Sequence, residues 1–231
     1  MNKSFILFLI IIILASCKTD VAKEVNEIKI PSDLQSIGLL LDSINIQDQK
    51  YRDELDGISE KYGWNSKEMM KHWDKIRVVD RSNLRVVEKI LSDHGWLSSE
   101  QIGSTANSTL FLVIQHADQK SQEKYLPMMR EAVKNGMAES RSLALLEDRV
   151  ALGKGELQIY GSQIGTDQKT GELFVLPLMD PETVNERRAE VGLGPIEDYI
   201  SRWDLEWDLE AYKKELPELI KDLKESTPNK S

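Results

Sequence analysis

The spacing of apolar residues predicts amphipathic helices over much of the first 152 residues. In residues 33–62, apolar side chains recur three and four positions apart, as on one face of a helix. The members of this stripe are Leu34, Ile37, Leu41, Ile44, Leu55 and Ile58. Gly63 follows and can supply the left-handed residue that ends a helix. Further helices are expected over residues 81–94, 105–114, 122–134 and 140–152.

Capping residues mark several of the predicted helix ends. Asp80 is a candidate N-cap for residues 81–94, and Gly95 is the matching stop signal. Ser98 and Gln101 have the spacing of a capping box. Residues 105–114 are apolar almost all round, which predicts a central buried helix.

Beyond residue 155 the pattern changes to that of strands. Residues 156–164 and 173–178 are strand-like, and turn residues separate them, so a β-hairpin is expected. Asp180 before Pro181 is a strong start signal for a helix over residues 182–191. The tail from residue 203 mixes acidic residues with Trp and Leu, and Pro217 interrupts it. The expected fold class is α+β and mainly α-helical: a helical domain with one β-hairpin and a C-terminal helix.

The N-terminus predicts export and a lipid anchor. Residues 5–14 form an unbroken apolar run behind Lys3. This run is too short to cross a bilayer, which takes roughly twenty residues, so a cleaved signal peptide is favoured. Leu14-Ala-Ser-Cys17 fits a bacterial lipobox and contains the one cysteine of the chain. An ordinary signal peptide with a chance cysteine is the alternative.

These features divide the chain into four predicted segments. Residues 1–16 are a lipoprotein signal peptide, residues 17–32 a polar tether, residues 33–202 the mainly helical domain and residues 203–231 an acidic C-terminal helix or tail. Lipid on Cys17 would hold the protein at a membrane of the bacterial cell envelope, periplasmic or surface-exposed.

Charge and composition exclude several classes of function. The formal net charge is −9, which disfavours nucleic acid as a partner because phosphate binding needs clustered Lys and Arg. With Cys17 lipidated, no thiol remains for a disulfide or a metal. A three-histidine metal site would need His72, His94 and His116 to converge. We therefore expect no metal and no cofactor. The partner is expected to be an unknown small molecule, a glycan or a protein.

Polar residues that could carry chemistry directly follow the predicted central helix. If the helix continues, Gln115, Asp118 and Gln122 share one face. If it ends near Ala117, Asp118 could orient His116 as a general acid/base. The alternative is a buried polar network that satisfies helix ends and the hairpin backbone.

A second polar group follows in the last helix before the hairpin and in the hairpin itself. Its members are Asp148, Arg149, Gln158, Tyr160 and Gln163. Arg149 could bind a carboxylate or phosphate in bidentate fashion, or could cap a helix C-terminus. On a strand, residues 158 and 160 share a face and residue 163 takes the other, unless Gly161 introduces a bulge. Catalytic roles are considered for His116, Asp118 and Arg149, and ligand-binding roles for the remaining candidates.

The order of short motifs from about residue 80 to residue 199 resembles a bacterial family called domain of unknown function 6624. The motifs are Asp80…Asn83, Gly95-Trp96, Leu112-Val-Ile-Gln-His-Ala-Asp118, Leu146-Glu-Asp-Arg-Val150, Gln158-Ile-Tyr-Gly-Ser-Gln163 and Asp180-Pro181. Ser162 stands where the family more usually has Thr, which keeps the hydroxyl. The resemblance implies that these motifs belong to one unit, and it supplies no activity.

Three functions are compatible with these observations. The first is a binding or interaction module whose cleft is lined by the two polar groups. The second is a metal-independent hydrolase or transferase in which His116 is the general acid/base and Arg149 holds an anionic group. The third is a protein-binding envelope factor, such as an immunity-type partner, that acts through Trp203 and Trp207 in the tail.

Overall fold

The computed structural model describes residues 28–167 and 170–226. The predicted signal peptide, Cys17 and most of the predicted tether lie outside the described residues. Within the described part of the chain, no helix is both long enough and apolar enough to cross a membrane.

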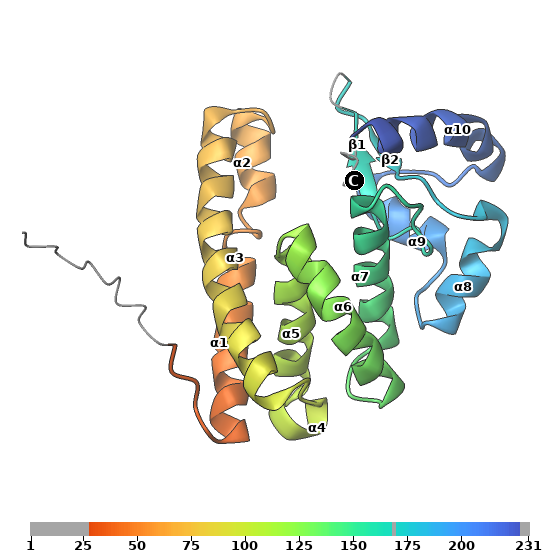
Figure 1. Cartoon of the computed structure of the whole chain (residues 1–231). Helices are drawn as coiled ribbons and strands as arrows, with labels where there is room; N and C mark the ends of the chain where they lie inside the picture. The colour runs from red at the N-terminus through yellow and green to blue at the C-terminus, as the bar shows by residue number, and fades with distance from the viewer. Residues whose placement is uncertain (1–27, 168–169, 227–231) are drawn as a thin grey trace, which may run out of the picture.

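Long helices form the first part of the fold, and Figure 1 shows several of them standing side by side. Their bounds are α1 Leu34–Lys50, α2 Leu55–Tyr62, α3 Lys67–His94, α4 Ser99–Ile102, α5 Ser104–His116, α6 Gln119–Lys134 and α7 Ser140–Gly153. The apolar helix α5 is central, since it contacts α1, α3, α4, α6 and α7. This confirms the central buried helix that the sequence predicts.

Side-chain caps fix where these helices begin. Asp33 accepts a hydrogen bond from the backbone N–H of Ser36 at 2.8 Å, and Ser66 accepts one from Met69 at 3.1 Å. The predicted capping box of Ser98 and Gln101 is present. Each cap satisfies a backbone donor that the first turn leaves without a helical partner.

Two helix boundaries differ from the prediction. Residues 33–62 form two helices, because the chain turns at residues 51–54 before α2 begins. Conversely, α3 begins fourteen residues before Arg81, at Lys67. Asp80 therefore lies inside α3 and is not an N-cap. The reason is that buried Met69, His72 and Ile76 extend the inward-facing stripe of α3 toward the N-terminus.

The hairpin is present but shorter than predicted. Its strands are β1 Ile164–Thr166 and β2 Leu173–Val175, which pair in antiparallel fashion with Ile164 opposite Val175. Residues 156–163 form an irregular loop, and only an isolated parallel bridge joins Gln158 to Leu178. The loop is irregular because buried side chains hold its backbone, as described below.

Several short helices and the longer α10 follow the hairpin and lie on one side of it (Figure 1). They are the 3₁₀ turns η1 Pro181–Thr183 and η2 Ser201–Trp203 and the helices α8 Val184–Glu190, α9 Ile196–Ile200 and α10 Leu209–Ser226. Asp180 takes the N-cap position before Pro181, as predicted, but it has φ 40° and its side chain makes no capping hydrogen bond. Pro217 lies inside α10 and does not interrupt it.

Two apolar cores result. The bundle core joins α1, α3, α5, α6 and α7 around residues such as Ile37, Leu41, Val87, Leu110 and Ile114. The C-terminal core consists of Val175, Leu178, Val184, Ile196, Ile200 and Tyr212, with Trp207, Leu216 and Leu219 packed against it. The predicted fold class is confirmed: the protein is mainly helical, with one hairpin and a C-terminal helix.

Candidate functional site

His116 is the last residue of α5, and the chain leaves the helix immediately after it. Ala117 has an extended backbone with ψ 176°. The Gln122 side chain donates to the carbonyl oxygens of Gln115 and Ala117, both at 2.9 Å. These bonds satisfy carbonyls that the helix end leaves free. Gln122 is 5% exposed, so its predicted ligand-binding role is replaced by a structural one.

The carboxylate that orients His116 comes from α1 and is not that of Asp118. Nδ1 of His116 lies 3.0 and 3.1 Å from the two carboxylate oxygens of Asp48. Asp118 caps α6 instead, accepting from the N–H of Ser121 at 2.8 Å; this bond lowers the pKa of Asp118. The predicted pairing of His116 with Asp118 is therefore wrong, because each side chain is held by a different neighbour.

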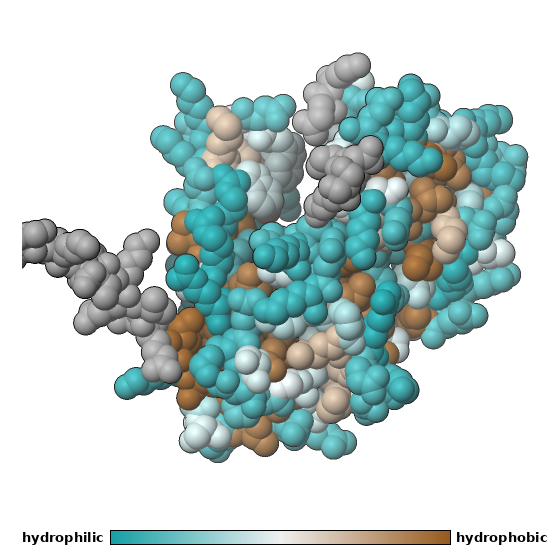
Figure 2. All heavy atoms as spheres, in the orientation of Figure 1, coloured by the Kyte–Doolittle hydropathy of each residue, from teal (hydrophilic) through white to brown (hydrophobic). Residues whose placement is uncertain are grey.

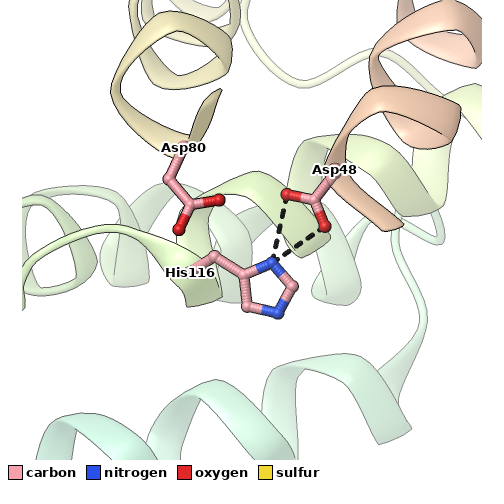
Figure 3. A group of neighbouring side chains, drawn as sticks. All are labelled: Asp48, Asp80 and His116. Carbon is pink, nitrogen blue, oxygen red and sulfur yellow. Dashed lines mark hydrogen bonds and ion pairs between the residues drawn. The ribbon is translucent and has the colours of Figure 1, made fainter. Parts of the chain in front are cut away.

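The Asp48–His116 pair joins a buried carboxylate to a partly exposed imidazole. Only 1% of the Asp48 side chain is exposed, against 17% of His116. In Figure 3, Nδ1 faces Asp48 and the other ring nitrogen, Nε2, points away from both aspartates. A carboxylate bonded to Nδ1 selects the tautomer that carries its proton there, which leaves the Nε2 lone pair for a ligand.

Arg52 and Asp80 complete the cluster. Arg52 lies 2.9 Å from both carboxylate oxygens of Asp80 and 3.4 Å from Asp48. It also donates to the Asp48 carbonyl at 2.8 Å. Burial raises the pKa of the Asp80 carboxyl, and the contacts with Arg52 oppose that increase. One guanidinium is therefore shared by two carboxylates.

The same cluster offers donors that a cation could use. One ligand atom each from Asp48, Asp80 and His116 lies within 4.8 Å of the others. Nitrogen and carboxylate oxygen are common ligands of divalent metals. However, Arg52 already contacts both carboxylates and supplies the positive charge that a cation would bring. The geometry thus favours an ion-paired cluster, and the absence of a metal stays a prediction.

Arg149 differs from the charged side chains of the cluster around His116 in having no polar partner. Within the described ranges it has no hydrogen bond or ion pair, and its Nε is enclosed and unpartnered. Burial lowers the pKa of the Arg149 guanidinium; Tyr199 opposes this and the positive charge of Arg52 adds to it. An enclosed, unpaired charged group is unfavourable, which marks Arg149 as a candidate for ligand binding.

Asp148, the neighbour of Arg149, has a structural role. Its carboxylate is fully buried and accepts backbone N–H bonds from Ile159, Tyr160 and Ser162 at 2.6 to 2.9 Å. Burial raises the pKa of Asp148, and these donors oppose the increase. The carboxylate satisfies the loop backbone, so it cannot also bind a ligand.

Gln158 also serves the fold. Its amide donates to the carbonyls of Gln163 and Leu176 and accepts from the N–H of Gln163, and it is fully buried. Gly161 has φ 66°, a conformation that glycine adopts readily. The loop therefore closes on itself around Gln158. This corrects the predicted ligand-binding roles of Gln158 and Asp148.

The remaining candidates are partly exposed. Gln115 adjoins His116, and Gln163 donates to the hydroxyl of Ser162 at 2.9 Å. Tyr160 donates its backbone N–H to Asp148, and its carbonyl accepts from Arg188 at 2.7 Å. Burial raises the pKa of the Tyr160 hydroxyl. The predicted set thus divides into a buried network and a smaller group of accessible side chains.

Asp48 and Arg52 are the members of the cluster that sequence reasoning missed. A signal for Asp48 exists, because it continues the inward-facing stripe of Ile37, Leu41 and Ile44 at helical spacing. A carboxylate on an apolar stripe must find a partner inside the protein. That partner, His116, lies 68 residues further along the chain, which helix periodicity does not reveal.

Residues 33–212 match the sequence profile of a family described as a family of unknown function, DUF6624. The chain belongs to the DUF6624 family. The match begins before the predicted region of resemblance, so the DUF6624 domain includes α1 with Asp48 and Arg52. No curated protein and no solved structure matches the chain.

Other surface features of the DUF6624 domain contain none of the predicted site residues. A groove of about 450 Å³ lies between α1 and α4, lined by Leu34, Gln35, Gly38, Leu39, Asp42, Gln101 and Ile102. Figure 2 shows a largely hydrophilic face with scattered apolar residues. His94 is exposed, and His72 is buried with Nε2 2.5 Å from the Tyr51 carbonyl oxygen. The three histidines therefore do not share one site.

Proposed function

We propose that this DUF6624 protein is a metal-independent hydrolase or transferase in which His116 is the general acid/base and Asp48 is its positioning residue. The observation that carries the proposal is the contact of a buried carboxylate with Nδ1 of a partly exposed imidazole. This is the arrangement by which a carboxylate fixes the tautomer and orientation of a catalytic histidine.

The proposed chemistry uses only the free ring nitrogen. His116 donates a hydrogen bond from its Nδ1–H group to Asp48, and Nε2 accepts a proton from a water molecule or a hydroxyl group as that oxygen attacks the substrate. The imidazolium then returns this proton to the leaving group. Asp48 stays ionised and stabilises the imidazolium, while Arg52 and Asp80 hold Asp48 in place.

Nitrogen-15 NMR of the full chain, labelled at histidine, tests the tautomer. We expect the proton of neutral His116 on Nδ1, and we expect Asp48→Asn to redistribute it toward Nε2. His94 is the internal control, since its exposed ring should not respond to Asp48→Asn. A His116 proton on Nε2 in the unmodified chain would contradict the proposal.

A panel of chromogenic esters, phosphoesters and glycosides then tests the reaction. Removing a general acid/base typically lowers a rate by about 10² to 10⁴-fold, so His116→Gln should lose most of any turnover. Asp118→Asn should keep it, because Asp118 caps α6. Turnover that survives His116→Gln would refute the assignment. Stoichiometric Zn²⁺ that raises the melting temperature only when His116 is present would instead identify a metal site.

We also propose that lipid on Cys17 anchors the protein in the bacterial cell envelope. The lipobox pattern behind a short apolar run supports this. Growth with a labelled fatty acid should label the unmodified chain and not Cys17→Ser. Equal labelling of both proteins would contradict the anchor.

The partner-binding role of the tail stays a separate prediction. Trp207 packs against the C-terminal core and lies 4.9 Å from the Tyr212 ring, between centroids. Trp203 is 37% exposed and makes an edge contact with Tyr199. Trp207 is thus part of the fold, and Trp203 is the more accessible residue for a protein partner.

A further inference from the structure

A second arginine near the loop 158–163 shows what a satisfied guanidinium looks like in this protein. Arg188 is 1% exposed. It donates to the carbonyls of Gly194 at 2.6 Å and Tyr160 at 2.7 Å, and it stacks 4.9 Å from the Tyr199 ring centroid. Burial lowers the pKa of Arg188, but two of its nitrogens donate hydrogen bonds and the guanidinium also contacts an aromatic ring. Arg188 is therefore built into the fold.

Arg149 has none of these partners, although it is near the same tyrosine. Its Nε is enclosed without a hydrogen bond, while the Nη groups are not enclosed and form the accessible end. The role of helix cap is already filled, because the N–H groups of Lys154 and Glu156 bond to the last carbonyls of α7. Gln119 donates to the Val150 carbonyl as well. Arg149 is thus not needed to satisfy the end of its helix.

The position of Arg149 connects it to the His116 cluster. Gln119, three residues after His116, bonds to the residue that follows Arg149 at 3.1 Å. The C-terminal end of α5 and that of α7 therefore lie at the same end of the bundle, as Figure 1 also shows. Arg149 is also close enough to Arg52 for the two charges to interact. A ligand beside Nε2 of His116 could thus extend toward Arg149.

We propose that Arg149 binds a carboxylate group of the molecule on which His116 acts. The role of His116 in this inference rests on the proposed function. The choice of a carboxylate as the bound group rests on the unpaired guanidinium of Arg149. Arg149 presents one uncompensated positive charge, because Arg52 is already shared by Asp48 and Asp80. One charge matches a carboxylate, whereas a phosphate monoester brings nearly two. A carboxylate also fits the planar, bidentate geometry of a guanidinium.

The first test compares two arginine variants of the full chain. Arg149→Met should keep or raise the melting temperature, since it removes an enclosed charge that lacks a partner. Arg188→Met should lower the melting temperature by several degrees, since it leaves two carbonyls without donors. If Arg149→Met lowers the melting temperature as much as Arg188→Met, Arg149 is scaffold and the inference is wrong.

The second test measures binding of the simplest carboxylate. Acetate should raise the melting temperature above the value in sodium chloride at equal ionic strength, and neutral acetamide should not. Arg149→Met should weaken the apparent acetate affinity about tenfold or more, as expected for loss of a charged hydrogen-bonding partner. A response to acetate that survives Arg149→Met, or its absence in the unmodified chain, would overturn the carboxylate assignment. So would a stronger response to inorganic phosphate.

His116→Gln separates this inference from the proposed function. The variant keeps Arg149, so the acetate response should persist while turnover is lost. If acetate binds through Arg149 but turnover never depends on His116, the proposed function fails and the carboxylate site stands. If turnover depends on His116 and acetate does not bind through Arg149, the proposed function stands and the carboxylate site fails.

Discussion

The hydroxyl of Tyr212 links α10 to the chain that follows β2. It accepts from the N–H of Leu178 at 2.8 Å and donates to the carbonyl of Leu176 at 2.9 Å. The side chain is 8% exposed, and burial raises the pKa of the phenol. A single hydroxyl therefore satisfies two backbone groups that would otherwise be buried without partners.

We predict that Tyr212→Phe lowers the free energy of unfolding by about 1 to 3 kcal/mol near pH 8, the usual cost of leaving such groups unsatisfied. The folded-state pKa is raised, so the contribution of the protonated phenol is complete below the unfolded pKa of about 10. It is lost as the pH rises above that value. The stability difference between the two proteins should thus narrow above about pH 10, as urea unfolding at several pH values can measure.

Tyr62→Phe is the matched control, because Tyr62 is 47% exposed. Its effect should stay within about 0.5 kcal/mol. A Tyr212→Phe deficit that is equal at all pH values would mean that the hydroxyl does not titrate in the way its burial requires.

Single residues were the hardest feature to predict from the sequence. The sequence indicates His116 as a candidate because polar residues follow an apolar helix. The partner of His116 was assigned to Asp118, two residues away, whereas the structure places Asp48 there. For Gln158 and Asp148 the sequence leaves a ligand cleft and a buried network open, and their hydrogen bonds to backbone groups match the buried network. The choice could not be made beforehand, because burial depends on long-range packing. Residue type indicates chemistry, and only the fold decides whether a side chain reaches solvent.

At the scale of elements, one glycine permits the closest approach between helices α1 and α4. A Cβ atom on Gly38 would lie 2.6 Å from the backbone carbonyl oxygen of Ile102. Real Cβ atoms do not come so near to a backbone oxygen, so α4 would have to move away from α1. The contact between these helices therefore depends on the missing side chain.

We predict that Gly38→Ala lowers the free energy of unfolding by about 1 to 3 kcal/mol, the cost of forcing extra atoms into packed structure. Gly57→Ala is the control, since Gly57 lies exposed in α2 with nothing within 4 Å of the added Cβ. Alanine there should raise stability by about 0.5 to 1 kcal/mol, because glycine is a poor helix former. Urea unfolding of both variants measures whether each substitution lowers or raises the free energy of unfolding. Equal effects would show that helix propensity alone decides both positions.

Helices were predicted well because their periodicity is a local property of the chain. The prediction located the central helix, the capping box at Ser98 and the hairpin turn. It broke down where tertiary contacts override local signals: Asp80 resembles an N-cap in sequence but lies inside α3. Residues 156–163 have strand-like composition, yet their backbone N–H groups donate to the side chains of Asp148 and Gln158, which hold them in an irregular loop. The bonds to Asp148 join residues eleven to fourteen positions apart and have no local signature.

At the scale of the whole molecule, Asp148 joins the two cores. The residue belongs to α7 in the bundle, and its carboxylate holds three N–H groups of the loop that leads to the C-terminal core. Breaking these bonds should leave each core intact while weakening their connection. We therefore expect the unmodified protein to unfold in one cooperative transition and Asp148→Asn to separate the two cores.

Two tryptophans can report on the cores separately. Trp96 is buried in the bundle core, and Trp207 packs against the C-terminal core. Two variants are needed: one keeps only Trp96, the other keeps only Trp207, and the remaining tryptophans are replaced by Phe. The fluorescence midpoints of these two variants in urea should coincide. Asp148→Asn should lower the free energy of unfolding by about 3 kcal/mol, because an amide would replace the carboxylate that accepts from buried N–H groups. This loss should fall on the Trp207 transition more than on the Trp96 transition.

Asp118→Asn tests whether the effect belongs to this carboxylate or to any aspartate that accepts backbone N–H bonds. Asp118 caps α6 at its exposed N-terminus, and asparagine is about as good an N-cap as aspartate. Both midpoints should therefore stay together and unchanged in Asp118→Asn. If Asp148→Asn also shifts both midpoints equally, the cores are coupled by their apolar contacts, and the loop network adds only stability. A separation confined to Asp148→Asn would show that one buried carboxylate makes the two cores unfold as one unit.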